Sequence, residues 1–522
     1  MKTSKKILAI LLTAVMILGL AACGGGKDDT TAEPSGQAGS GYEETVYSAY
    51  QADLSTPDPY GSTEAVVAFF TNMTFRTVTF NNPDTGKLEG VLAESWKDVN
   101  GDGKVWDVVL KKGVKFHNGE ELTAEDVKFT WEYAGAGSGK TTKTIAVYSS
   151  VEKIECPDTY TVRFTLKVPM FDYPTYLDQK VYCKKAFDTL DAAEAGVIGC
   201  GPYYFDKELT TSGVQFGCTR FDDFYLGTEK YPTKHIVFKV VSDYSTQVAK
   251  LQAGEIDFLF NLTTTNYEIL NADPNINGIS RGGANSYFMG FNYRKDIWYN
   301  AGLRRALAMA INKEDIVDGN FNTVGAVVSN NFCAPSGAGY IEVKDPVKYD
   351  PDAAKTWLQE NGFGNLKIKI ASNVTQKTNC EIIQAALKGV GVEVEIQEVE
   401  STSWAETLKT GDYDIFCNYC AYQGALLYNF QRFLYTGGSS NTFSHSEPEF
   451  DKLYDEAANA SSYDEMVAKF QVLEQWVSDQ QTLVPLAIAN FFAAALKDVQ
   501  GISLAPTTNW QDFSTVYIPS RK

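Results

Sequence analysis

Strands alternate with helices along much of the sequence, and this order constrains the fold more than any other feature. Five predicted elements follow one another as strand, helix, strand, helix and strand, at residues 366–371, 378–388, 392–399, 404–410 and 413–419. Two parallel strands need a long crossover connection, which is usually a helix that packs on one face of the sheet. The pattern therefore predicts an α/β fold whose mixed sheets are flanked by helices.

Two further helices have clear boundary signals. A helix predicted at residues 245–252 lies between predicted strands at residues 236–241 and 256–260. Another helix is expected to begin at Asp350 and end at Gly362. Aspartate caps the first backbone N–H groups, the proline that follows it fits the first helical position, and glycine tolerates the turn that ends a helix.

The charge of the chain argues against nucleic acid as a partner. The 522 residues carry 46 basic and 65 acidic side chains, a formal net charge of −19, whereas nucleic-acid-binding proteins present basic surfaces. The three histidines, His117, His235 and His445, are far apart in the sequence, so we expect no metal site and no cofactor. At about 100–200 residues per domain, the length predicts at least two domains.

The first 41 residues predict export and attachment to a membrane. Three lysines precede an apolar stretch at residues 7–20, which is typical of a signal peptide and short for a membrane-spanning helix. The stretch ends in Leu-Ala-Ala-Cys23, which resembles the bacterial lipobox, whose cysteine receives a lipid. We predict a lipoprotein signal peptide at residues 1–22, lipidation of Cys23 and a flexible tether at residues 23–41. The alternative is an ordinary signal peptide in which Cys23 has no role.

Eight cysteines remain after Cys23. Cys200 and Cys218 flank a predicted hairpin and are the candidate pair for a disulfide. Cys417 and Cys420 have the spacing of a redox motif, which suits a helix N-terminus. The residues before Cys417 alternate as in a strand, where residues three apart point to opposite faces, so we interpret these two cysteines as structural.

Two glycine-rich segments copy parts of ligand-binding motifs. Residues 134–141 match a relaxed phosphate-binding loop, but they follow a predicted helix at residues 127–133 instead of a strand. Residues 98–103 copy the start of a calcium loop, but Val109 stands at the twelfth position, where a glutamate is needed. We therefore expect a surface loop at the first segment and a tight turn at the second.

Several segments together resemble one protein family. Specific matches in the N-terminal half are Leu92-Ala-Glu-Ser-Trp96, Leu110-Lys-Lys-Gly-Val-Lys-Phe-His-Asn-Gly119 and Leu122-Thr-Ala-Glu-Asp-Val127. Further matches follow in the same order as in the family, including Gly199-Cys-Gly-Pro-Tyr203, Leu251-Gln-Ala-Gly-Glu-Ile-Asp257 and Leu303-Arg-Arg-Ala-Leu-Ala-Met-Ala-Ile-Asn312. The chain thereby resembles the extracellular solute-binding proteins of family 5, the oligopeptide, dipeptide and nickel receptors of ABC importers.

The resemblance implies a two-lobed, periplasmic-binding-protein-like fold of type II, in the large cluster that carries an extra inserted subdomain. Such receptors close on a ligand between two α/β lobes. His117 lies in the family's signature and is expected to be a packed or hydrogen-bonded loop residue. The implied parts are a discontinuous lobe I at residues 42–75, 196–275 and 490–522, the inserted subdomain at residues 76–195, and lobe II at residues 276–489.

The resemblance also places a ligand-binding loop after the strand that begins near Asp414. Peptide receptors of the family carry a Trp-x-x-Asp segment there, and its aspartate pairs with the α-ammonium group of the peptide. Counted from Asp414 without gaps, this chain has Cys420 at the tryptophan and Gln423 at the aspartate. Gln423 has no charge, so either the ligand lacks a free amine in the usual place or another acid supplies the charge. The remaining alternative is a shifted loop, in which Asp412 or Asp414 only caps the strand.

Aromatic residues supply the other candidates for the ligand site, because their rings stack on sugars and pack beside peptides. We rank Tyr287, Tyr422 and Gln423 first, and the alternative is that most of the rings belong to the core. The predicted ligand-binding residues are Tyr287, Phe288, Tyr419, Tyr422, Gln423, Tyr428, Trp404 and Trp510.

The resemblance implies a receptor and not an enzyme. We expect a monomer, extracytoplasmic and lipid-anchored to a bacterial cell membrane, that delivers an oligopeptide to the transmembrane subunits and cytoplasmic ATPases of an ABC permease. An oligosaccharide or another uncharged solute is the alternative, because of Gln423 and the tyrosines. An exported hydrolase is the third hypothesis, although the sequence has neither a GxSxG nor an HExxH motif. Nickel and haem, known cargoes in the family, are disfavoured because no histidine lies in the mapped ligand loops.

Overall fold

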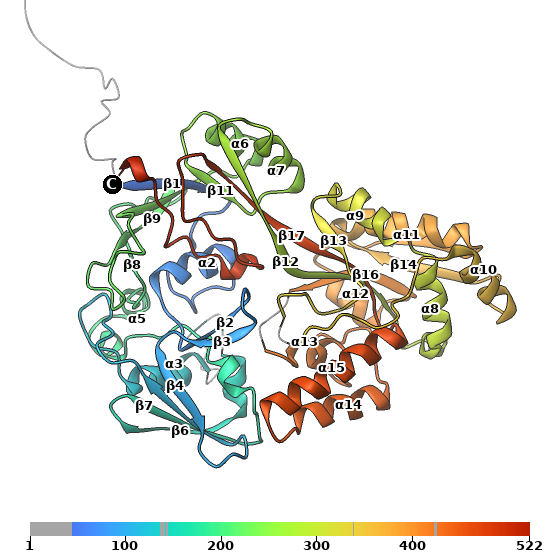
Figure 1. Cartoon of the computed structure of the whole chain (residues 1–522), viewed down its shortest axis with the longest axis horizontal. Helices are drawn as coiled ribbons and strands as arrows, with labels where there is room; N and C mark the ends of the chain where they lie inside the picture. Colours follow the sequence, from blue (N-terminus) through green and yellow to red (C-terminus); the bar gives the residue numbers. More distant parts are fainter. Residues whose placement is uncertain are drawn as a thin grey trace, which may run out of the picture. The chain divides into compact units, whose positions relative to one another are not determined.

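The computed structural model of the chain describes residues 44–135, 141, 143, 145–337, 339–421 and 425–521 (Figure 1). The predicted signal peptide, Cys23 and the tether lie outside the described residues, as do Tyr422 and Gln423 of the predicted ligand loop. Among the described residues, no helix has the length and the apolar character needed to cross a bilayer.

Most of the strands form one mixed sheet of eleven strands (Figure 1). They are β1 (Thr45–Tyr50), β8 (Tyr203–Phe205), β9 (Gln215–Arg220), β10 (His235–Val240), β11 (Phe258–Phe260), β12 (Ile276–Phe291), β13 (Ala326–Val328), β14 (Lys367–Ser372), β15 (Glu393–Glu398), β16 (Ile415–Ala421) and β17 (Val484–Leu496). The order is β15-β14-β16-β12-β17-β11-β1-β10-β9-β8, with β13 paired to β17 beside this path. β14 is parallel to β15 and β16, and β1 is parallel to β10 and β11, whereas the other pairs are antiparallel.

Two smaller antiparallel sheets come from the N-terminal half. One is the hairpin of β2 (Thr79–Asn82) and β3 (Lys87–Gly90). The other has the order β4-β5-β7-β6 and contains β4 (Ala93–Asp98), β5 (Val105–Leu110), β6 (Val151–Asp158) and β7 (Thr161–Leu166). Between β4 and β5, the Asp98 carboxylate accepts hydrogen bonds from the N–H groups of Gly101 and Gly103, at 3.0 and 2.6 Å. The segment that copies a calcium loop is therefore a tight turn, as predicted.

Helices cover these sheets. The α-helices are α2 (Ala65–Thr74), α3 (Ala124–Gly135), α4 (Lys184–Thr189), α5 (Ala192–Ala195), α6 (Tyr244–Gln252), α7 (Thr264–Asn271), α8 (Ala301–Met309), α9 (Lys313–Phe321), α10 (Pro351–Glu360), α11 (Lys377–Gly389), α12 (Trp404–Thr410), α13 (Tyr428–Phe433), α14 (Pro448–Ala458) and α15 (Tyr463–Gln480). The 3₁₀-helices are η1 (Ala146–Ser150), η2 (Tyr173–Tyr176), η3 (Asp296–Tyr299), η4 (Val374–Gln376), η5 (Thr508–Trp510) and η6 (Pro519–Arg521).

The predicted alternation of strands and helices is confirmed. β14, α11, β15, α12 and β16 follow one another within three residues of the predicted boundaries, and the three strands are parallel neighbours. The helix signals also hold: the Asp350 carboxylate accepts from the N–H of Ala353 at 2.9 Å, and Gly362 has a φ of 83°. α6 and its flanking strands β10 and β11 occur where they were expected.

β12 and β17 are the long strands of the main sheet and lie side by side (Figure 1). β12 has 16 residues and β17 has 13. In the order of the sheet, the two strands lie between β16 on one side and β11 and β1 on the other. Their register shifts between Gly282 and Asn285 and again between Tyr287 and Phe288. Such irregularities bend a strand locally and increase its twist.

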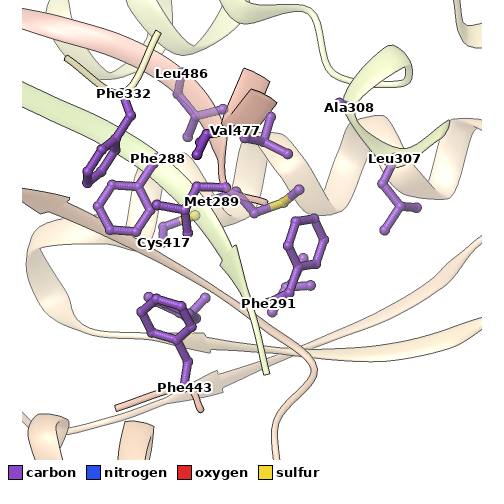
Figure 2. Close-up of a cluster of buried hydrophobic side chains, with 14 of the residues drawn as sticks. Phe288, Met289, Phe291, Leu307, Ala308, Phe332, Cys417, Phe443, Val477 and Leu486 are labelled. Atoms are coloured by element: carbon purple, nitrogen blue, oxygen red, sulfur yellow. The ribbon is translucent and has the colours of Figure 1, made fainter. Parts of the chain in front are cut away.

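The buried side chains form separate clusters. The largest extends from Phe288 to Ala487 and packs the strands around β16 against α8 to α15; Figure 2 shows its centre, with Met289, Phe332 and Cys417. A second extends from Tyr60 to Cys200 around the sheet of β4 to β7. Two more clusters lie on the strands around β1.

Candidate functional site

The predicted ligand loop follows β16, whose strand conformation settles the role of the two nearby cysteines. Cys417 and Cys420 lie within β16 and not at a helix N-terminus, and they are 0% and 5% exposed. Burial raises the pKa of Cys420 to about 12, so this thiol is inert near neutral pH. The structural interpretation of the CxxC spacing is therefore confirmed.

The candidate disulfide is wrong. Every described cysteine is free. Cys218 lies in β9 beside Phe216 and Phe238, whereas Cys200 belongs to the buried cluster around β4 to β7. The hairpin between them was predicted correctly, because β8 and β9 are antiparallel partners.

Tyr287 and Tyr419 are brought together, since they face each other across β12 and β16. Their rings stack with centroids 5.3 Å apart at an interplanar angle of 25°, and Phe321 of α9 packs edge-on against Tyr287 at 5.0 Å. Tyr419 remains 44% exposed. Phe321 also lines an open hollow of about 320 Å³ between the start of α7, the end of α9 and β17, whose other lining residues include Thr263, Asn320 and Asn490.

Phe288 points to the opposite face of β12 from Tyr287, because successive residues of a strand alternate. Its ring is 0% exposed and packs in the core against Phe332 and Phe433, with centroids 5.5 and 6.2 Å away (Figure 2). The prediction that Phe288 lines the ligand site is therefore wrong for this conformation, because no part of the ring is accessible.

The other predicted aromatic residues lie in different places. Trp510 of η5 packs beside Ile488, which pairs with Ser286 and so lies on the face opposite Tyr287. Trp404 begins α12 and is partly buried against the core. Tyr428 begins α13, where the guanidinium of Arg432 lies 5.6 Å from its ring centroid. The described residues of the predicted set do not all face one site, since Phe288 and Trp510 lie on the opposite face from Tyr287; Tyr422 and Gln423 lie outside the described residues.

The acids at the start of β16 are already neutralised. The ammonium group of Lys295 lies 2.9 Å from both Asp412 and Asp414, and that of Lys369 lies 2.9 Å from Asp412. The hydrogen bond from Lys369 and the second lysine hold the pKa of Asp412 at about 2. Asp414 also accepts from the backbone N–H of Lys369 at 2.8 Å, which ties β14 to the start of β16. These acids hold the strands together.

A group of residues that the sequence analysis missed lies where η2 approaches α13 to α15. Burial raises the pKa of Tyr176 in η2, and the nearby groups that add to this effect are Asp172, Tyr454, Tyr428 and Asp178. Asp172 likewise adds to the raised pKa of Tyr454 in α14 and of Tyr463 at the start of α15, after burial. The segment before η2 therefore lies close to three helices that are distant in sequence.

Asp172 is the unusual member of this group. It is 3% exposed, and its Oδ2 atom has no hydrogen-bond partner among the described residues. Burial raises the pKa of its carboxyl to about 6, and no described cation offsets its charge. The one available signal in the sequence was that Asp172 is the only charged residue in the stretch 168–177.

Asp178 is a second acid on the same segment, but it has cations nearby. Burial raises its pKa to about 6, while the charges of Lys143 and Lys180 act in the opposite direction. Gln179 donates to its Oδ1 at 2.6 Å. The ammonium of Lys180 donates to the Thr71 hydroxyl at 2.7 Å and to the carbonyl of Ala68 at 3.0 Å.

His117 is a hydrogen-bonded loop residue, as predicted. Its Nδ1 accepts from the N–H of Gly199 at 3.3 Å, so Nε2 carries the proton and donates to the carbonyl of Gly201 at 3.1 Å. Burial lowers the pKa of His117 to about 4. In the part of the chain that the structure describes, no three histidine, cysteine or acidic side chains are grouped as a metal site would require. Most of the loop at residues 134–141 lies outside that part.

Curated relatives match nearly the full length of the chain. The di/tripeptide-binding protein 1 of Pseudomonas aeruginosa is 25% identical over 83% of this chain and 86% of its own length. The heme-binding protein A of Haemophilus influenzae is 26% identical over 96% of this chain and 97% of its own. The oligopeptide-binding protein AppA of Bacillus subtilis is 25% identical over 97% of both chains.

Solved structures show the same fold. HbpA2 from Haemophilus parasuis superposes with a TM-score of 0.80 at 22% identity, over 91% of this chain and 99% of that one. The fold is thus the two-lobed type II architecture expected from the sequence. The family model of the bacterial extracellular solute-binding proteins, family 5, matches residues 87–442, and the chain belongs to this family of extracytoplasmic binding receptors.

Proposed function

We propose that the protein is a receptor that captures an oligopeptide between two lobes and delivers it to an ABC import permease. The family match over residues 87–442 carries this proposal, because it covers most of the chain. The separate buried clusters support the proposed division into lobe I at residues 42–75, 196–275 and 490–522, an inserted subdomain at 76–195 and lobe II at 276–489.

A peptide is the ligand that the relatives favour. Two of the three relatives described above are named for binding peptides. The third is named for haem, but His445 of this chain is buried, and His117 and His445 each bond to a backbone carbonyl, which disfavours their binding iron. We further propose that Cys23 carries the lipid that anchors the receptor outside the cell membrane.

An uncharged ligand such as an oligosaccharide is the second candidate. Counted from Asp414 without gaps, Gln423 stands where the resemblance places an amine-binding aspartate, and Tyr287 and Tyr419 offer stacked rings with exposed surface. A sugar ring stacks well on such faces, and phenolic hydroxyl groups bind its hydroxyls.

Calorimetry separates these ligands. The chain from residue 24 onward, without its lipid, is titrated with unacetylated alanine peptides of two to six residues and with maltose and maltotriose. We expect heat of binding for at least one peptide length and none for the sugars. Saturable binding of a sugar and of no peptide would replace the peptide proposal by the second candidate. Loss of peptide uptake after deletion of the gene, without peptide turnover by the pure protein, is the expected result in cells.

A further inference from the structure

We propose that Asp172, on the segment before η2, binds a ligand ammonium group in place of the acid that this chain lacks after β16. Tyr176, Tyr454 and Tyr463 supply the hydroxyl groups around it. The inference rests on the proposed function only in taking the ammonium to be that of a peptide.

Charge balance distinguishes Asp172 from Asp178 and from Asp412 and Asp414, the acids before β16. Asp412 and Asp414 are each held by lysine at 2.9 Å, so a ligand ammonium would have to displace a lysine there. Asp178 has the charges of Lys143 and Lys180 in its vicinity. Asp172 has no cation to offset its charge among the described residues and forms no salt bridge with them.

Burial makes this missing partner significant. A carboxylate withdrawn from water is costly unless it is paired or protonated. Asp172 is 3% exposed; Tyr176 contributes a hydrogen bond to its carboxyl, but Oδ2 has no partner among the described residues and so retains unused capacity to accept one. An ammonium group has three donors and a positive charge, and it would satisfy both needs at once.

The tyrosines fit the same ligand chemistry. Their hydroxyl groups lie within electrostatic range of Asp172, as the raised pKa values of Tyr454 and Tyr463 indicate after burial. Phenolic oxygens accept hydrogen bonds from an ammonium group and carry no competing positive charge. Tyr463 is 37% exposed and Tyr454 and Tyr176 are partly exposed, so Asp172 is covered by side chains that a ligand can reach.

The position also agrees with the loop that follows β16. Tyr176 lies within electrostatic range of Tyr428, and Tyr428 comes five residues after Gln423. The negative charge would then come from the segment before η2 and not from the loop after β16. This exchange explains how Gln423 is compatible with an amine-bearing ligand.

The test compares a free amine with a blocked one. Pentaalanine and N-acetylpentaalanine are titrated by calorimetry into the wild type, Asp172→Asn and Asp178→Asn. We expect Asp172→Asn to lower the affinity for pentaalanine about 10- to 100-fold, the value of a charged hydrogen bond, and to leave the weaker N-acetylpentaalanine unchanged. Asp178→Asn is the matched control and should change neither peptide more than about threefold, because nearby lysines already offset that charge.

Three outcomes overturn the inference. They are equal losses for both peptides, equal affinity of the wild type for both, and an equal effect of the two substitutions. If the wild type binds neither peptide, the proposed function fails. The ammonium-binding site is then tested separately with cadaverine, a diamine. Its stabilisation of the wild type in thermal melts should then disappear in Asp172→Asn and persist in Asp178→Asn, and any other pattern refutes the site. Asp172→Asn should fold normally, because it removes a buried charge that has no partner.

Discussion

Replacing Glu474 tests whether a buried acid lowers the free energy of unfolding of this chain at a pH where the acid is charged. Glu474 lies in α15 and is 1% exposed, and its burial outweighs the hydrogen bonds that Cys333 and Asn331 contribute. Burial raises its pKa from 4.5 to about 7. The folded state therefore binds this proton more tightly than the unfolded state does.

The sign and size follow from proton linkage. The free energy of unfolding has its full value below the pKa of Glu474 in the unfolded chain, near pH 4.5. It falls as the pH rises, until the pKa in the folded state, near 7, is passed. A shift of this size corresponds to about 3 kcal/mol at pH 8. Glu474→Gln is neutral at every pH, so we expect it to raise the free energy of unfolding by about 3 kcal/mol at pH 8 and by almost nothing at pH 4.

Urea unfolding of both proteins between pH 4 and pH 8, followed by tryptophan fluorescence, measures the difference. Glu465→Gln on the same helix is the matched control with the opposite sign. Hydrogen bonds from Ser461 and Lys469 hold the pKa of Glu465 at about 2, so its replacement should destabilise the protein at pH 7. A gain from Glu474→Gln that is the same at pH 4 and pH 8 would refute the electrostatic argument and point to packing.

Two further predictions concern the buried polar groups of the core. Arg304 is 0% exposed and pairs with Glu447 at 3.0 Å, so Arg304→Met should cost about 3–5 kcal/mol in urea unfolding by stranding the glutamate, whereas the exposed Arg305→Met should change little. The pKa of His117 is about 4, so its NMR ring signals should stay those of the neutral form, protonated at Nε2, from pH 8 down to pH 5; a titration midpoint near 6.5 would contradict the burial argument.

The secondary structure was predictable where local signals agree. Apolar alternation defined β14, β15 and β16, and capping residues defined the ends of α10, because these signals act over a few neighbouring residues. β16 begins at Ile415, two residues later than predicted. The Asp414 carboxylate, just before the strand, accepts hydrogen bonds from the backbone N–H of Lys369 and the ammonium of Lys295, and these contacts between distant residues are not contained in one segment of sequence.

The candidate site was less predictable, because a ring's role depends on the face to which it points. Tyr287 and Phe288 are consecutive aromatic residues, yet Tyr287 stacks on Tyr419, whereas Phe288 lies fully in the core. Asp172 and Tyr454 are 282 positions apart, and only the fold brings them within electrostatic range. Their proximity has no sequence signal other than a lone acid in an apolar stretch.

The net charge of −19 does not by itself select an amine-bearing ligand. Two lysines already pair with Asp412 and hold its pKa at about 2. An incoming ammonium group would therefore interact with this carboxylate little more favourably than with water. Asp172 differs because water is excluded from it and no described cation is beside it, so a ligand charge interacts there in a medium of lower dielectric. Salt screens the long-range attraction that speeds encounter, but it screens a buried contact much less. The ratio of affinities for free and acetylated pentaalanine should therefore survive added salt, even where association slows.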